Sequence, residues 1–217
     1  MKNHKANINN IIDELISETI NANLTDEMHL HERYLHHRFS FLAQEAGYYI
    51  SFNNKTAQFH PEWATAIKGI RDGGFYKGIK EGYVPCDVKK DKMNDALGGN
   101  PGFIDFAIGG FYEPDYAIEF KMAKGMNTKG FEFDYMKLLD KRNHFKNAIS
   151  LSVLYSRKTP LDSEVLGACF DSAKNKLGHY YDKEKPYRFI VIQLLKGNYY
   201  IWERNNDVKE FKLISQN

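Results

Sequence analysis

The sequence predicts an α/β fold in which helices flank a central mixed β-sheet. Apolar residues recur at helical spacing near the N-terminus, two short strands lie in the middle of the chain, and three more strand-like runs lie near its end. Helices, then strands, then helices and strands again are expected when helices cover a mixed sheet. With 217 residues, of which 42% are hydrophobic, the chain can bury a full core as one domain over 1–217.

Two helices are expected at the start of the chain. Apolar residues every three or four positions predict an extra N-terminal helix over 7–24. A second helix is expected over 25–46, with Thr25 as its N-cap and Gly47 directly after its end.

The next part of the chain is harder to assign to regular structure. A strand is expected at 48–52 and a short helix at 60–70. Residues 69–102 are punctuated by glycine and lysine, which predicts a long exposed excursion. This excursion contains no GxxxxGK[ST] motif, so it is not a phosphate-binding loop of that type.

The second half of the chain supplies most of the sheet. Two strands are expected at 103–108 and 116–122, followed by a long helix at 132–155. The last expected elements are a helix at 162–179 and a terminal β-meander within 187–214, with strands at 187–195, 197–204 and 208–214.

Composition excludes several classes of protein. A net charge of +2 gives no overall basic field, so a nucleic-acid partner would have to bind a local patch. The two cysteines lie far apart without a CxxC spacing, which argues against a structural zinc site. No signal peptide and no apolar run of membrane-spanning length is apparent, so we expect a cytoplasmic protein with no membrane partner.

The two central strands each carry charge among apolar residues. Alternation places Asp105 on one face of its strand and Ile104, Phe106 and Ile108 on the other. In the second strand, Glu119 and Lys121 share a face by the same rule. These charges are the first candidates for a functional site.

A hairpin would bring the two acids together. If residues 109–115 form its loop, residue 112 is the midpoint, and Asp105 falls opposite Glu119. Facing carboxylates about 5 Å apart destabilise a sheet unless something compensates their charge. Mg²⁺ or Mn²⁺ would compensate it, and Lys121 would emerge about 7 Å along the strand, near a bound water or phosphate. The alternative is a solvated face on which Glu119 and Lys121 pair in water.

An acid on one strand, a hairpin, and then Glu-x-Lys on the next strand resembles the PD-(D/E)xK nuclease superfamily. The motif here is Asp105, thirteen intervening residues, and then Glu119, Phe120 and Lys121. The resemblance implies a restriction-endonuclease-like fold and a Mg²⁺-dependent endodeoxyribonuclease that hydrolyses DNA, in which Mn²⁺ can replace Mg²⁺. It also implies that Asp105, Glu119 and the Phe120 carbonyl hold the metal and that Lys121 serves the attacking water and the phosphate.

The sequence departs from the family pattern before the first acid. Ile104 stands where the family name has proline, a departure that the superfamily tolerates. A literal Pro114-Asp115 pair exists, but only three residues separate it from Glu119, too few to return to a neighbouring strand. We interpret Pro114 and Asp115 as residues that favour a turn.

The resemblance extends to the flanking segments. Family members often carry a glutamate on a helix before the first strand, and Glu32 lies one turn ahead of the apolar stripe of its expected helix. It would complete the outer shell of the metal or bind a second ion, or it pairs with His36 in water. The catalytic core would comprise 25–52 and 103–156.

Basic residues near the motif are candidates for DNA contacts. Residues 121–158 carry nine lysines and arginines against three acids, which suits either a phosphate-binding patch or a solvated helix face. The proposed DNA contacts are Lys124 and Lys129, together with Lys77 and Lys80 from the excursion. The excursion could equally be a charged loop without a DNA contact. The sequence leaves open whether the chain acts as a homodimer.

The histidine-rich segment 29–37 invites comparison with HExxH metal sites. His31 and His36 are five residues apart, about 140° around a helix, so they cannot share one ion from one face. His29 and His36 do share a face with Glu32, which suits either a metal site or a wet surface.

Two alternatives to a nuclease stay open. A domain of this fold can serve as a DNA-binding or assembly module with little or no cleavage, because fold does not determine chemistry. The charges could also be structural in an unrelated α/β domain, which would bind no divalent cation.

Overall fold

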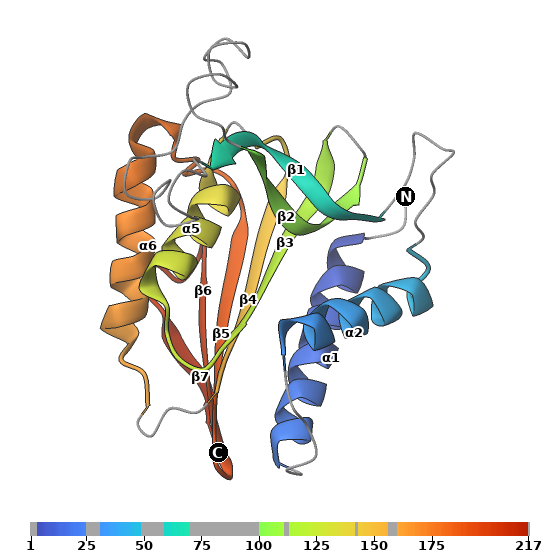
Figure 1. Ribbon diagram of the computed structural model, residues 1–217, viewed down its shortest axis with the longest axis vertical. Coiled ribbons are helices and arrows are strands. Elements are labelled where there is room, and N and C mark those ends of the chain that lie inside the picture. Colours follow the sequence, from blue (N-terminus) through green and yellow to red (C-terminus); the bar gives the residue numbers. More distant parts are fainter. Residues whose placement is uncertain are drawn as a thin grey trace.

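The computed structural model describes residues 4–24, 31–48, 59–69, 100–110, 113–141, 143–155 and 160–216. Its strands form one seven-stranded sheet in which the spatial order from β1 to β7 follows the sequence. Helices α1 and α2 cover one face, and α5 and α6 cover the other (Figure 1). The predicted α/β class, with helices flanking a mixed sheet, is confirmed.

The elements have the following bounds. The helices are α1 (His4–Leu24), α2 (Glu32–Glu45), α5 (Thr128–Leu139), α6 (Ser163–Leu177) and the short 3-10 helix η1 (Gly178–Tyr180). The strands are β1 (Phe59–Gly69), β2 (Asn100–Gly109), β3 (Pro114–Ala123), β4 (Asn147–Tyr155), β5 (Tyr187–Leu195), β6 (Asn198–Asn205) and β7 (Lys212–Gln216).

The sheet is parallel at its centre and antiparallel at both sides. β3, β4 and β5 run parallel because α5 and α6 form the connections between them. β1 and β2 continue the sheet antiparallel beside β3, and β6 and β7 do the same beside β5. The central strands are therefore buried on both faces, as parallel strands usually are.

Each face of the sheet has its own apolar core. On the α1/α2 side, Phe39 of α2 packs into an aromatic cluster with Phe59, Phe106 and Phe120, whose ring centroids lie 5.1–6.1 Å from that of Phe39. Phe39 is completely buried. This cluster joins α2 to β1, β2 and β3, and it fixes the position of the residues one and two turns earlier in the helix.

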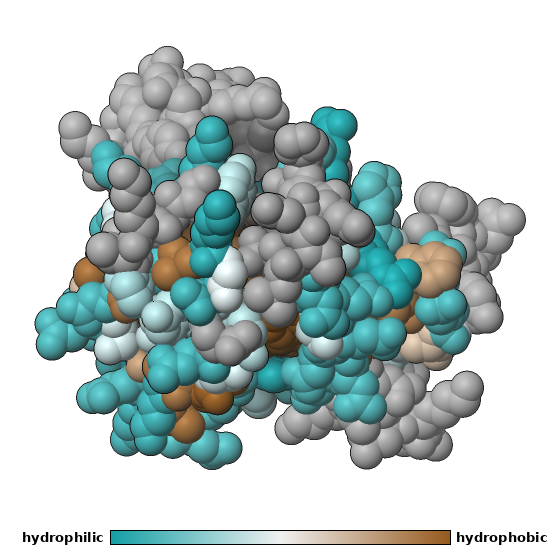
Figure 2. All heavy atoms as spheres, turned by 90° about the horizontal axis from the view of Figure 1, so that it is seen from below, coloured by the Kyte–Doolittle hydropathy of each residue, from teal (hydrophilic) through white to brown (hydrophobic). Residues whose placement is uncertain are grey.

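The described surface carries little contiguous apolar area. The face in Figure 2 is largely hydrophilic, and its apolar side chains form small, separate patches. The large apolar side chains that are exposed come from three different elements: Phe41, Val165, Leu213 and Ile214. No helix among the described residues combines the length and the apolar character needed to cross a membrane.

Two sequence-based expectations are wrong. The helix expected at 60–70 is strand β1, and the single helix expected at 132–155 is helix α5 followed by strand β4. Residues 147–155 are mostly apolar, but Ser150 and Ser152 alternate with Ile149, Leu151 and Val153, and this period of two favours a strand. Asp140 ends α5 in an extended conformation, which lets the chain return as a strand.

The other element boundaries agree in part. The expected helices at 7–24 and 162–179 correspond to α1 and α6, while α2 begins only at Glu32, with His31 as the N-cap residue. The last strand lies at 212–216 rather than 208–214, because mutual backbone hydrogen bonds between Asn205 and Val208 make a turn there. Thr25, residues 49–52 and most of the 69–102 excursion lie outside the described residues.

Candidate active site

The sheet forks where the two acids lie. β2 pairs with β1 along most of its length, from Asn100 to Ile108. It pairs with β3 only from Phe106 to Gly109. Beyond Ile118, β3 continues along β4 alone. The register Phe106 to Ile118 is the one predicted from a hairpin centred on residue 112, so Asp105 and Glu119 face each other at the fork.

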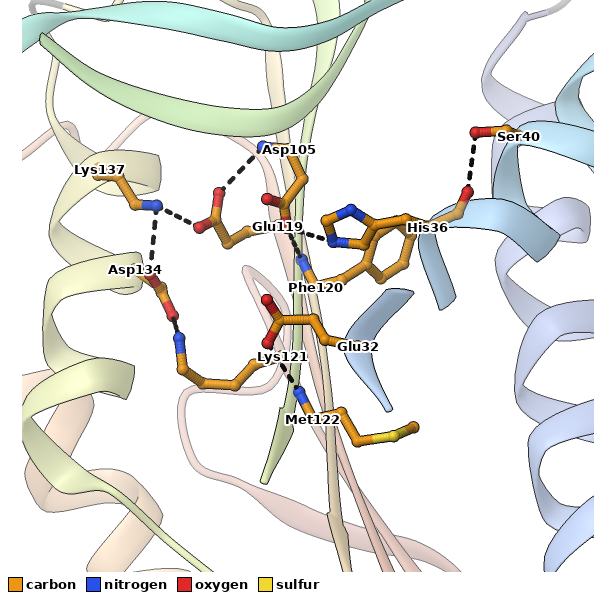
Figure 3. Close-up of polar contacts among 10 residues, drawn as sticks. All are labelled: Glu32, His36, Ser40, Asp105, Glu119, Phe120, Lys121, Met122, Asp134 and Lys137. Atoms are coloured by element: carbon orange, nitrogen blue, oxygen red, sulfur yellow. Dashed lines mark hydrogen bonds and ion pairs between the residues drawn. The ribbon is translucent and has the colours of Figure 1, made fainter. Parts of the chain in front are cut away.

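Carboxylates replace the missing backbone partners at this fork. Asp105 Oδ2 accepts a hydrogen bond of 2.7 Å from the Phe120 N–H, and Glu119 Oε2 accepts one of 3.3 Å from the Asp105 N–H. Each acid thus satisfies a backbone donor of the opposite strand, as a buried donor requires. Figure 3 shows these reciprocal contacts between the two strands.

The fork also changes the faces that β2 presents. Phe106 and Ile108 belong to the core under α1 and α2, whereas Ile104 belongs to the core under α5 and α6. The expectation that Ile104 shares a face with Phe106 and Ile108 is therefore wrong. β2 keeps one register with β1 from Phe103 to Ile108, so the change of core coincides with the separation of β2 from β3 at Asp105.

Helix α2 supplies two more polar side chains. Glu32 Oε2 accepts a hydrogen bond of 3.2 Å from the Met122 N–H, and His36 Nε2 lies 3.4 Å from Asp105 Oδ2. The N–H groups of Phe120 and Met122 leave β3 toward the same edge, because they are two residues apart in a strand. The Phe120 carbonyl points to that edge as well, between the positions taken by Asp105 and Glu32.

Helix α5 supplies a buried ion network on the other side of β3. Lys137 Nζ contacts a carboxylate oxygen of Glu119 and lies 3.2 Å from Asp134 Oδ1. The second oxygen of Asp134 binds Lys121 Nζ. The four charged groups therefore alternate in sign from Glu119 through Lys137 and Asp134 to Lys121, as Figure 3 shows.

Burial and charge shift the pKa values of this network. Burial raises the pKa of Glu119 well above its ordinary value, against the opposing effect of Lys137, and the charge of Asp105 adds to the increase. Burial alone would lower the pKa of Lys121, but the carboxylate of Asp134 outweighs it and raises the pKa. Burial likewise opposes ionisation of Asp134, yet Lys137 and Lys121 hold its pKa below the usual value.

The donor set and the charge fit a divalent cation. Within the part of the chain that the structure describes, four carboxylates, those of Glu32, Asp105, Glu119 and Asp134, gather near only two ammonium groups, those of Lys121 and Lys137. Among the described residues, no three His, Cys, Asp or Glu side chains form a ready-made ligand group. The candidate ligands are therefore two carboxylates, Asp105 and Glu119, with the Phe120 carbonyl, an oxygen set of the kind that Mg²⁺ prefers.

No family model, curated protein or solved structure matches the chain. Geometry and charge are therefore what support a function for it. The four residues expected at the site come from α2, β2 and β3, and all four lie around the fork.

The basic stretch 121–158 does not act as one patch. Lys137 is buried among acids, and Lys146 binds Asp115 at 2.7 Å. Lys124 and Lys129 are exposed between β3 and the first turn of α5, where they remain candidates for phosphate contacts. Lys77 and Lys80 lie outside the described residues.

Two neighbours of the site, Asp134 and Lys137, were not expected to be part of it, and a third, His36, was an open candidate. Asp134 and Lys137 are opposite charges three residues apart in a helix that is mostly apolar from Phe131 to Leu139, a pattern that fits a buried pair. This pattern was missed because the expected helix at 132–155 had many basic residues, which were interpreted as either a phosphate-binding patch or a solvated face. His36 shares its helix face with Glu32, and that spacing was its only signal.

Proposed function

We propose that the protein is a metal-dependent nuclease that hydrolyses phosphodiester bonds in DNA. The observation that carries the proposal is the fork, where Asp105, Glu119, Lys121 and Glu32 converge from three elements. Such a convergence of acids and a lysine is what metal-assisted phosphodiester hydrolysis requires. The proposal includes the PD-(D/E)xK superfamily and its restriction-endonuclease-like fold.

The roles of the residues follow from their surroundings. Asp105, Glu119 and the Phe120 carbonyl would hold Mg²⁺, or Mn²⁺ in its place. Bound there, such an ion supplies activation of water and neutralisation of phosphate charge. Glu32 holds the edge of β3 at Met122 and would complete the outer shell.

Lys121 is suited to act as a cation rather than as a base. Asp134 raises its pKa, so the ammonium form persists at neutral pH. Its side chain is 20% exposed, which is more than that of the other three members of the α5 network. Lys121 would therefore orient the attacking water and stabilise negative charge that develops on the phosphate.

One incubation tests this proposal directly. Purified protein is mixed with plasmid, linear and branched DNA in Mg²⁺, in Mn²⁺ or with a chelator, and products are separated by size. We expect cleavage with either ion and none with the chelator. Failure to cut any of these substrates with either ion would contradict the proposal.

One observation favours a second candidate, a DNA-binding or assembly module of the same fold. Glu119 and Lys121 already have ion-pair partners on α5, as structural charges would. The same samples distinguish the two functions when binding is measured by gel shift. Tight binding without cleavage would support the module.

A further inference from the structure

Lys137 is a buried cation held by two acids. Only 5% of its side chain is exposed, and its partners Glu119 and Asp134 are buried to a similar degree. A buried ammonium group is costly unless it is paired and hydrogen-bonded. The position of Lys137 is therefore tightly tied to those of the two acids.

This lysine also fixes the orientation of the Glu119 carboxylate. Lys137 holds oxygen Oε1 on the α5 side of β3, which turns Oε2 toward Asp105, 3.3 Å from its N–H. Oε2 is thus the oxygen that a cation shared with Asp105 would take. Its contact with the N–H is long, so it can be exchanged for a stronger one.

Asp134 fixes the direction of Lys121 in a similar way. Its two oxygens divide between the two lysines, Oδ1 to Lys137 and Oδ2 to Lys121. Gly130 in the first turn of α5 leaves room for the stem of Lys121, because a Cβ there would lie 3.2 Å from the Lys121 Cε. α5 thereby positions the lysine that the proposed function places at the phosphate.

We propose that Lys137 and Asp134 are positioning residues of the candidate site, Lys137 acting through Glu119 and Asp134 acting through Lys121. The inference rests on the proposed nuclease function. It adds that α5 orients the Glu119 carboxylate and the Lys121 ammonium group before metal and DNA bind. Mutation of residues that hydrogen-bond to metal ligands typically lowers metal affinity or activity ten- to a hundredfold.

Metal affinity separates positioning from simple charge for Lys137. We expect Lys137→Met to weaken Mn²⁺ binding about ten- to a hundredfold in calorimetry, because Glu119 loses its orientation. Loss of a nearby positive charge alone would have the opposite sign and tighten binding. Unchanged or tighter binding would overturn the role of Lys137.

A kinetic measurement tests Asp134. At saturating Mn²⁺, Asp134→Asn should lower kcat on DNA about tenfold or more with KM little changed, since Lys121 loses its anchor. Asp134→Glu should restore part of this loss. Wild-type kcat in Asp134→Asn would overturn the role of Asp134.

A control and a second variant keep the experiment decisive. Lys176→Met removes the ion pair between Lys176 of α6 and Glu132 of α5, two residues that are not members of the candidate site, and should leave metal affinity and kcat unchanged. If Lys137→Met does not fold, Lys137→Arg keeps the charge but moves the donors, and wild-type Mn²⁺ affinity in it overturns the inference. Wild-type protein that neither binds Mn²⁺ nor cuts DNA overturns the proposed function itself, and this inference with it.

Discussion

The two sides of β3 hold their charges in different ways. On the α5 side, Glu119, Asp134 and Lys137 are almost completely buried and satisfy one another as ions. On the α2 side, Asp105 and His36 have side chains that are 21% and 31% exposed. The carboxylates on that side accept hydrogen bonds from backbone N–H groups instead of pairing with lysine.

This difference indicates separate tasks for the two sides. A buried ion network holds its members in one arrangement, because moving any member exposes an unpaired charge to a medium of low polarity. Carboxylates that are partly exposed can add a cation without breaking an ion pair. We therefore expect the metal ion to enter from the α2 side. The α5 side would hold Glu119 and Lys121 in position.

The largest effect is expected at Asp105. Asp105→Asn keeps an oxygen for the Phe120 N–H but removes the charge, so cleavage should fall on the order of a thousandfold with little loss of stability. Kinetics on plasmid DNA and thermal unfolding measure the two quantities. Asp115→Asn is the matched control, since Asp115 lies at the start of β3 and binds Lys146. Equal activity of the two variants would remove Asp105 from the site.

Glu119→Gln should lower cleavage to a similar extent, but at a cost in stability. The buried ammonium of Lys137 would keep only Asp134 as an anionic partner. Leaving a buried charged group partly unsatisfied costs about 1–3 kcal/mol of the free energy of unfolding. Asp105→Asn without such a loss, beside Glu119→Gln with one, would confirm that only the α5 side is an ion-paired support.

The α2 side depends on apolar packing for its position. Phe39→Ala should lower the free energy of unfolding by about 3–5 kcal/mol, because it empties the centre of the aromatic cluster. Urea denaturation measures this change. Phe41 lies on the same helix but is 50% exposed, so Phe41→Ala should change stability by less than about 0.5 kcal/mol. Similar losses in both variants would show that α2 is not anchored through Phe39.

The sequence predicted the register of Asp105 and Glu119 better than it predicted the surroundings of the two acids. Register followed from the loop midpoint, because antiparallel pairing is symmetrical about a hairpin. The position of Glu32 followed from its place on the apolar stripe of Leu35 and Phe39. These are local relations, which spacing alone can reveal.

The α5 network could not be read in the same way. Glu119 and Lys137 are eighteen residues apart, and their contact requires knowing that α5 ends at Leu139 and that β4 follows. The segment 147–155 does carry a strand signal that was overlooked, because Ser150 and Ser152 alternate with Ile149, Leu151 and Val153. With that segment assigned to a helix, Lys137 was expected either in a phosphate-binding patch or on a solvated face, whereas the structure buries it.

A smaller effect on activity is expected at Glu32, and it tests the α2 side. Glu32→Ala removes the acceptor of the Met122 N–H, and we expect a loss of activity of about tenfold that excess Mn²⁺ partly restores. Activity at limiting and at saturating metal is the measurement. Glu45→Ala changes an exposed acid at the other end of α2 and should have no effect. Equal activity of these two variants at limiting Mg²⁺ would assign Glu32 a purely structural role.

The smallest effect concerns a second buried lysine, which shows what the acids of the α5 network do. Lys185 is as buried as Lys137, but its ammonium group donates to the carbonyls of Asp140 and Asn143, at 2.8 and 3.0 Å, and lies 4.0 Å from the Asp182 carboxylate. Burial lowers the pKa of Lys185 to about 8, whereas Glu119 and Asp134 overcome burial and raise that of Lys137.

A lowered pKa makes the contribution of Lys185 to stability depend on pH. Between about pH 8 and the ordinary lysine pKa of 10.5, the unfolded chain binds the proton that the folded protein has released. The free energy of unfolding should therefore rise with pH across this window, on the order of 1 kcal/mol, relative to Lys185→Met. Urea denaturation of both proteins at pH 7.5 and pH 9.5 measures the difference. A neutral amine keeps two N–H donors for the two carbonyls, so the folded state loses no hydrogen bond on deprotonation. A difference that falls with pH would mean that the two carbonyls and the Asp182 carboxylate hold Lys185 as a cation despite its burial.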